Sequence, residues 1–185
     1  MAINERIISR TFRRLYGKPC WGVQYDRQLN LSLNFGKPSL RIREPRGTKS
    51  KSPLVQQIFS QRQVRVRGQW WLWIFCAYWR LSLLNMPPVT GSSSGKHINE
   101  AIARLDGQKL TLVDVNSLTG ATRFGFDLGG TLECRRFAQD SADLWTLYEP
   151  SGNVLAVQGN GTFSHGPGSA TKQRFQKMKV DEQST

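Results

Sequence analysis

Apolar residues fill one continuous stretch near the middle of the chain, residues 69–84. No charged side chain occurs between Trp70 and Trp79, and four of the six tryptophans of the chain lie there. Apolar residues at consecutive positions are typical of a strand that is buried on both faces. Aromatic enrichment and the alternating residues 64–67 before the stretch favour a strand over a buried helix. We therefore predict a core strand here.

Shorter alternating segments predict further strands on either side of this stretch. Residues 20–26 and 29–35 fit two strands, and the second has apolar residues at every other position. A turn is expected at residues 36–38, and the alternation restarts over residues 40–43. From residue 110 onward the pattern is again one of strands and turns.

Three segments have a helical pattern instead. A short basic amphipathic helix is expected from about residue 4 to Gly17, and a helical turn over residues 53–60. Residues 96–105 carry apolar side chains at three- and four-residue steps, and a serine before them would cap the helix. The predicted fold is therefore mainly β, with antiparallel sheets and short helices.

The composition predicts two similar β modules. Residues 86–95 are rich in proline, serine and glycine, which is typical of a linker. We expect a basic β module with the tryptophan-rich core strand over residues 1–85 and a second β module over residues 96–168. The polar residues 169–185 are expected to form a flexible tail.

A repeated pattern raises the alternative that the two modules arose by internal duplication. The apolar alternation of residues 31–36 recurs in residues 124–129, in the same order relative to its neighbours. Chance similarity explains such short matches equally well. A duplication would place Trp73 and Trp145 at corresponding positions of the core.

A membrane location is the alternative to a core strand for the tryptophan-rich stretch. A transmembrane helix needs about 20 mostly apolar residues, and Arg80 interrupts this stretch after ten. We therefore predict no integral membrane segment, while an interfacial anchor stays open as an alternative. The first residues lack the apolar core of a secretory signal, so a cytoplasmic location is expected.

The net charge of +13 is confined to the first half of the chain. Residues 1–90 contain sixteen lysines and arginines but three acidic residues, whereas residues 91–185 contain ten of each kind. Such asymmetry predicts an anionic partner for the first half. Nucleic acid ranks first, followed by an anionic membrane and then an acidic protein.

Basic residues of the first half are the candidate binding site. Alternation puts Arg65 and Arg67 on one strand face with Val64 and Val66 inward, and such a basic face could track a phosphate backbone. Exposed aromatic rings such as Trp70 or Trp71 would add base stacking to a single strand. Alternatively, the arginines keep an apolar sheet in solution. The candidate nucleic-acid-binding residues are Arg10, Arg13, Arg14, Arg41, Arg43, Arg46, Lys49, Lys51, Arg62, Arg65 and Arg67.

Catalytic chemistry has weak support in the sequence. The three cysteines are widely spaced and the two histidines are too few for a multi-histidine metal site, so we expect buried thiols, no metal and no cofactor. The glycine–serine segment 91–96 lacks the spacing of a phosphate-binding loop. We therefore predict a non-catalytic protein, with a hydrolase centred on His165 as the weakest alternative.

The second half of the chain resembles a group of known proteins, mainly in the segments Phe126 to Arg136 and Leu144 to Leu155. Residues 105–168 resemble small uncharacterised all-β bacterial proteins, some of which are predicted to be immunity-type inhibitors. The resemblance implies a protein-binding inhibitor of a bacterial toxin or defence system as the alternative function, and it brings no catalytic residues. The basic first half differs from the acidic character expected of a nuclease inhibitor.

Overall fold

The computed structural model describes residues 3–26, 30–75, 77–137, 142–169 and 175–178. These residues form a mainly β protein, as the sequence predicts. In chain order the elements are α1 (Ile3–Arg13), β1 (Cys20–Tyr25), β2 (Leu31–Arg43), α2 (Pro53–Ser60), β3 (Gln63–Ile74), β4 (Ala77–Leu83), β5 (Met86–Thr90), α3 (Gly95–Leu105), β6 (Leu110–Val115), β7 (Thr122–Phe126), β8 (Thr131–Arg136), β9 (Asp143–Tyr148), β10 (Asn153–Gln158), β11 (Thr162–Pro167) and β12 (Gln176–Lys177).

The strands form two antiparallel sheets. The seven-stranded sheet has the order β1-β2-β3-β9-β10-β11-β12, and the five-stranded sheet has the order β5-β4-β8-β7-β6. Each sheet combines strands from before and after residues 86–95, because β3 pairs with β9 and β4 pairs with β8. The sheets thus mix the two expected modules, and residues 86–90 of the expected linker form β5.

The core lies between the two sheets, and α1 contacts both of them. The ring of Phe12 lies 6.0 Å from that of Phe124 on β7 and 5.6 Å from that of Trp145 on β9. The indole N–H of Trp145 donates a 2.8 Å hydrogen bond to Thr122 Oγ1, so its polar atom is satisfied in the core. Burial of these large rings is the main stabilising contribution.

The tryptophan-rich stretch forms β3 and β4, and its expected burial on both faces is wrong. Trp70, Leu72 and Ile74 are buried in the core, whereas Trp71 and Trp73 are half-exposed. Strand residues alternate between faces, and the second sheet covers one face of β3. Consequently the other face of β3 carries aromatic rings that solvent can reach.

The expected turn at residues 36–38 is a β-bulge within one long strand. The register of β2 against β3 shifts between Phe35 and Pro38, and Gly36 has a φ of 75°. A positive φ favours glycine because it has no Cβ. Pro38 is tolerated since β1 pairs with β2 no further than Phe35, so the proline lies outside the three-stranded part.

The helices agree with the predicted ones. α1 and α3 begin close to residues 4 and 96, and residues 53–60 form α2. The side chain of Ser94 accepts a 3.4 Å hydrogen bond from the backbone N–H of His97, as expected of an N-cap. The described residues contain no helix that is long and apolar enough to cross a membrane.

Two further expectations differ from the structure. In the tail, β12 pairs with β11 and Met178 is buried, while residues 170–174 and 179–185 lie outside the described residues. The topology does not show an internal duplication. Trp145 is fully buried in the core, whereas Trp73 lies on the outer face of β3, opposite Thr146 of β9.

Candidate nucleic-acid interface

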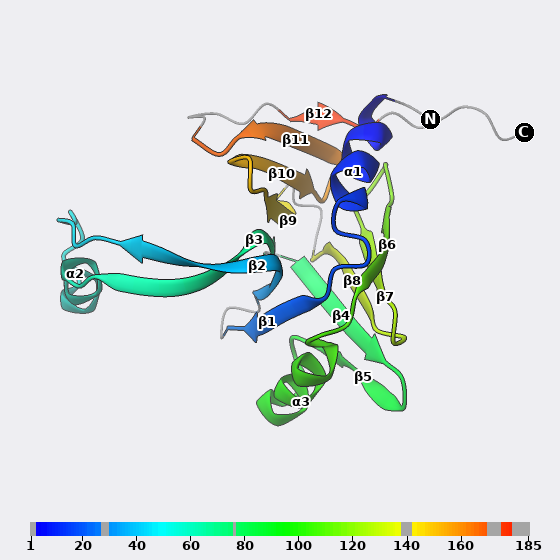
Figure 1. Ribbon diagram of the computed structural model, residues 1–185, viewed down its shortest axis with the longest axis horizontal. Coiled ribbons are helices and arrows are strands. Elements are labelled where there is room, and N and C mark those ends of the chain that lie inside the picture. Colours follow the sequence, from blue (N-terminus) through cyan, green and yellow to red (C-terminus); the bar gives the residue numbers. More distant parts are fainter. Residues whose placement is uncertain (1–2, 27–29, 76, 138–141, 170–174, 179–185) are drawn as a thin grey trace, which may run out of the picture.

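The hairpin of β2 and β3 extends beyond the sheet as a two-stranded arm, residues 38–43 and 63–68. Within the seven-stranded sheet β1 pairs with residues 31–35 of β2, and β9 pairs with residues 71–74 of β3. Past these points the described residues of β2 and β3 pair with each other. Figure 1 shows the arm projecting from the body, with α2 at its far end.

One face of the arm is basic because its register aligns arginines. Arg41 is directly opposite Arg65, Arg67 is opposite Ser39, and Arg43 is opposite Gln63. Residues opposite each other in an antiparallel pair point to the same side. The prediction that arginines of both strands share a face is therefore confirmed.

The other face of the arm is apolar and exposed, which corrects the inward placement of its valines. Val64 is 56% exposed and Val66 is 54% exposed, and their cross-strand partners Ile42 and Leu40 are equally open. Alternation assigned the two faces correctly. The error arises because the arm leaves the sheet before the core can cover its apolar side.

A column of stacked aromatic rings continues the basic face onto the sheet. Tyr148 lies 4.8 Å from Trp71, Trp71 lies 5.6 Å from Trp73, and Trp73 lies 4.3 Å from Phe75, measured between ring centres. The interplanar angles are between 14° and 23°. Mutual stacking holds these half-exposed rings in fixed positions.

Arg67 joins the arm to this column. Its guanidinium carbon lies 3.4 Å from the centre of a Trp71 ring, close enough for a cation–π contact. Burial and the neighbouring charge of Arg65 lower the pKa of Arg67 below its usual value. Burial likewise raises the pKa of Tyr148, and the charge of Arg67 opposes that rise. An anion placed between the two arginines would relieve their repulsion.

A groove of about 630 Å³ runs beside the column. Arg65, Arg67, Trp71 and Trp73 line it from β3, and residues of β1, of β2 and of α3 complete its wall. A smaller hollow of about 210 Å³ lies between Arg41, Arg67, Trp71 and Tyr148. Cations and aromatic rings thus line both depressions, and each also contains one acidic residue, Asp26 in the groove and Glu149 in the smaller hollow.

The remaining predicted residues lie apart from the groove. Arg46, Lys49, Lys51 and Arg62 are exposed around the far end of the arm. Arg62 forms a 2.9 Å ion pair with Glu44. These residues could extend a binding surface, but they do not line the groove.

Two of the predicted arginines have a structural role at the tip of the arm. The guanidinium carbons of Arg43 and Arg46 lie 4.4 and 4.8 Å from the centre of the Phe59 ring. The backbone N–H of Arg46 also donates to the carbonyl of Phe59. Together these contacts fasten α2 to the arm.

The three arginines near α1 do not join the basic face of the arm. Arg10 and Arg13 are exposed on α1, which Figure 1 places on the opposite side of the body from α2. Arg14 lies over the ring of Trp70 at 4.9 Å. Since Trp70 is buried in the core, its expected role in base stacking is wrong, whereas Trp71 is partly exposed.

His165 has a partner that sequence spacing could not identify. Its Nε2 lies 2.6 Å from Glu149 Oε1, and Arg14 Nη1 lies 3.7 Å from the other carboxylate oxygen. The Glu149 side chain is 4% exposed. Ser164, the adjacent hydroxyl, points to the opposite face because strand residues alternate. The cluster is a buried carboxylate contacted by an arginine and a histidine from distant parts of the chain.

The two described thiols are buried, as expected. Desolvation raises the pKa of Cys20 and that of Cys134 to about 12, so both remain protonated at neutral pH. Cys76 lies outside the described residues. Among the residues the structure describes, no three histidine, cysteine or acidic side chains gather in a way that could hold a metal ion.

No protein family, curated protein or solved structure matches this chain. Functional inference therefore depends on the groove, the arm and the charge distribution described above.

Proposed function

We propose that this protein binds single-stranded nucleic acid without catalysis, using the groove beside β3 and the basic face of the arm. The observation that carries this proposal is the position of Arg65 and Arg67 in the same groove as Trp71 and Trp73. Guanidinium groups bind phosphate oxygens in bidentate fashion, and aromatic side chains stack with bases of any sequence. The groove therefore offers a contact for each part of a nucleotide.

Charge and geometry support a chain-like ligand over a single nucleotide. On the arm, Arg41 lies directly opposite the groove residue Arg65, so successive phosphates would meet successive cations. Burial and, second, the charge of Arg65 lower the pKa of Arg67, and a phosphate would offset the repulsion between the two arginines. A duplex hides its bases, so it would lose the stacking contribution that a single strand retains.

Competition experiments test this proposal. A fluorescently labelled 20-nucleotide single strand is bound in physiological salt and displaced with unlabelled single strand, with duplex of the same sequence or with polyglutamate. We expect the single strand to compete at least tenfold better than either alternative. Equal competition by polyglutamate would show that the surface binds any polyanion, and it would contradict the proposal.

A second candidate function, that of a protein-binding inhibitor, is favoured by one observation. The apolar face of the arm exposes Leu40, Ile42, Val64 and Val66 side by side. Contiguous exposed apolar residues often mark a protein interaction surface. Substituting Ile42 and Val64 with threonine would weaken the binding of a protein partner but leave nucleic-acid binding unchanged. This pair of outcomes separates the two functions.

A further inference from the structure

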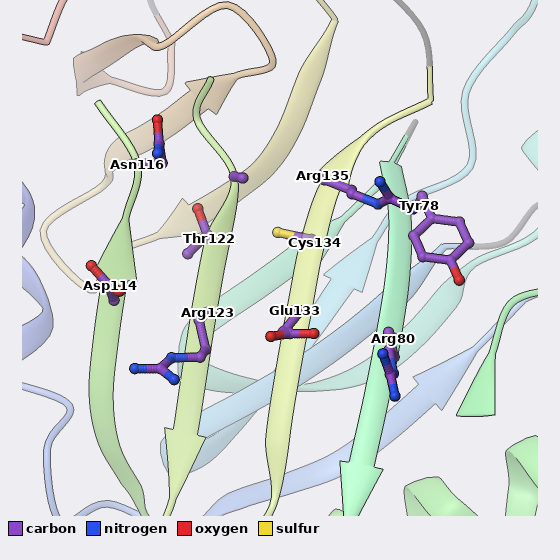
Figure 2. Close-up of a pocket in the computed structure, with 10 residues that line it drawn as sticks. Tyr78, Arg80, Asp114, Asn116, Thr122, Arg123, Glu133, Cys134 and Arg135 are labelled. Atoms are coloured by element: carbon purple, nitrogen blue, oxygen red, sulfur yellow. The ribbon is translucent and has the colours of Figure 1, made fainter. Parts of the chain in front are cut away.

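A second hollow lies on the outer face of the five-stranded sheet, away from the groove and the arm. It has a volume of about 640 Å³, within the range of pockets that hold small ligands. Figure 2 shows its lining side chains spread over β6, β7, β8 and β4. The core faces the opposite side of this sheet, where Trp79, Phe124 and Leu132 are buried.

Charges of alternating sign form one row across the hollow. Arg80 is opposite Glu133, Glu133 is opposite Arg123, and Arg123 is opposite Asp114. Unlike charges in such register are close enough to form ion pairs. Among the described residues, however, no ion pair within 4.0 Å joins any of these four side chains. Their polar groups therefore remain available to a ligand.

The next row contains a small residue between large ones, which opens the hollow. Thr122 of β7 is opposite Cys134 of β8. The register of this antiparallel pair therefore places Ala121, just before β7, opposite Arg135 of β8. The backbone N–H of Asn116 donates 2.8 Å to the carbonyl of Ala121, which places Asn116 on the other side. The methyl group of Ala121 thus forms the floor between an arginine and an amide.

Both neighbours of Ala121 are held in place by further contacts. The guanidinium carbon of Arg135 lies 4.7 Å from the centre of the Tyr78 ring. The side-chain oxygen of Asn116 accepts the backbone N–H groups of Leu118 and Thr119, each at 3.0 Å. The amide group of Asn116 keeps its N–H donors for another partner.

The donor and acceptor set points to one class of ligand. We propose that this hollow binds a small anion that also carries hydroxyl groups, of the sugar phosphate or sugar acid class. Arg123, Arg135 and Asn116 would bind its anionic oxygens, because planar guanidinium groups match phosphate and carboxylate geometry. Glu133 and Asp114 would accept hydrogen bonds from its hydroxyl groups, and these two carboxylates would repel the continuous negative charge of a nucleic-acid strand.

Isothermal titration calorimetry with four probes tests the site: glucose 6-phosphate, glucuronate, glucose and inorganic phosphate. The combined ligands, glucose 6-phosphate or glucuronate, should bind at least tenfold more tightly than glucose or phosphate, which each offer half of the chemistry. Which of the two binds better identifies the anionic group. Inorganic phosphate binding as tightly as both combined ligands, or no binding of any probe at 10 mM, would overturn the proposal.

Variants locate the binding within the hollow. Arg123→Ala with Arg135→Ala should weaken the better ligand at least tenfold, and Arg123→Lys with Arg135→Lys should weaken it while keeping the charge. The exposed Arg136, which does not line the hollow, supplies the control variant Arg136→Ala. Thermal unfolding verifies that each variant is folded. Unchanged affinity in both double variants would overturn the proposal.

Discussion

The guanidinium of Arg67 lies 3.4 Å from the centre of a Trp71 ring, at the point where the arm joins the sheet. Arg67 belongs to the row of cations on the arm, and Trp71 belongs to the aromatic column on β3. Their contact makes one continuous surface of two features that differ in chemistry. A nucleotide strand needs both features, one for its phosphates and one for its bases.

Replacing Trp71 with alanine should weaken single-strand binding by about 1–3 kcal/mol, the usual loss for one stacked base. The salt dependence should stay the same, because no phosphate contact is removed. Fluorescence anisotropy across a salt series measures both quantities. Trp21→Ala is the control, since Trp21 lies on β1 and does not line the groove. An equal loss of affinity in the control would contradict base stacking on Trp71.

Replacing His165 with alanine should lower the free energy of unfolding by about 1–3 kcal/mol. The buried Glu149 carboxylate would lose its 2.6 Å partner, and an unsatisfied buried acceptor is costly. Urea denaturation gives the free energies. The exposed pair of Arg62 and Glu44 is the comparison, and Arg62→Ala should cost at most about 1 kcal/mol. A His165→Ala protein as stable as Arg62→Ala would contradict a buried, partnered carboxylate.

The buried thiols should make stability depend on alkaline pH. Burial raises the pKa of Cys20 and Cys134 from 9.0 to about 12, so the folded state holds these protons more tightly than the unfolded state. Their contribution to stability is therefore complete below pH 9 and is lost as the pH rises toward 12. The Cys20→Ala, Cys134→Ala protein should lose stability less steeply over this range in urea denaturation. Parallel pH profiles would mean that the thiols are accessible.

The apolar face of the arm should contribute little to folding stability. Val64→Thr and Val66→Thr should each change the free energy of unfolding by at most about 0.5 kcal/mol, as exposed positions do. Leu72→Ala, on the buried face of the same strand, should cost about 2–5 kcal/mol. Guanidinium denaturation compares the three variants. Valine variants that lose as much stability as Leu72→Ala would mean that the arm packs against the body.

Alternation along β2 and β3 was sufficient to predict that Arg65 and Arg67 share a face, because side chains in a strand repeat every two residues. It could not identify which set of tryptophans faces the core. Trp70 and Trp71 both lie in a stretch that is apolar at every position, and shifting the assignment by one residue exchanges the two faces. The packing of the second sheet against β3 determines which tryptophans are buried, and this contact joins segments that are distant in sequence.

Long-range pairing accounts for the rest of the candidate site that the sequence did not predict. Tyr148 joins the aromatic column because β9 pairs with β3, in the register that aligns Tyr148 with Trp71. His165 of β11 contacts Glu149, which follows β9, because β10 pairs with both of these strands. Residues 86–90 of the expected linker form β5, although their proline content favours a loop. Pairing of β5 with β4 at the edge of the five-stranded sheet overrides that preference.

The most direct test of nucleic-acid binding compares two double variants that remove the same charge. Arg65→Ala with Arg67→Ala empties the groove of its cations, whereas Lys109→Ala with Arg136→Ala removes two exposed cations that do not line the groove. Anisotropy with a labelled single strand is measured from low to physiological salt. The groove variant should lower the slope of log affinity against log salt by about 1.4, or about 0.7 for each lost phosphate contact. The control variant should keep the wild-type slope. An equal change in both variants would show that net charge alone attracts the strand and would contradict the groove as its binding site.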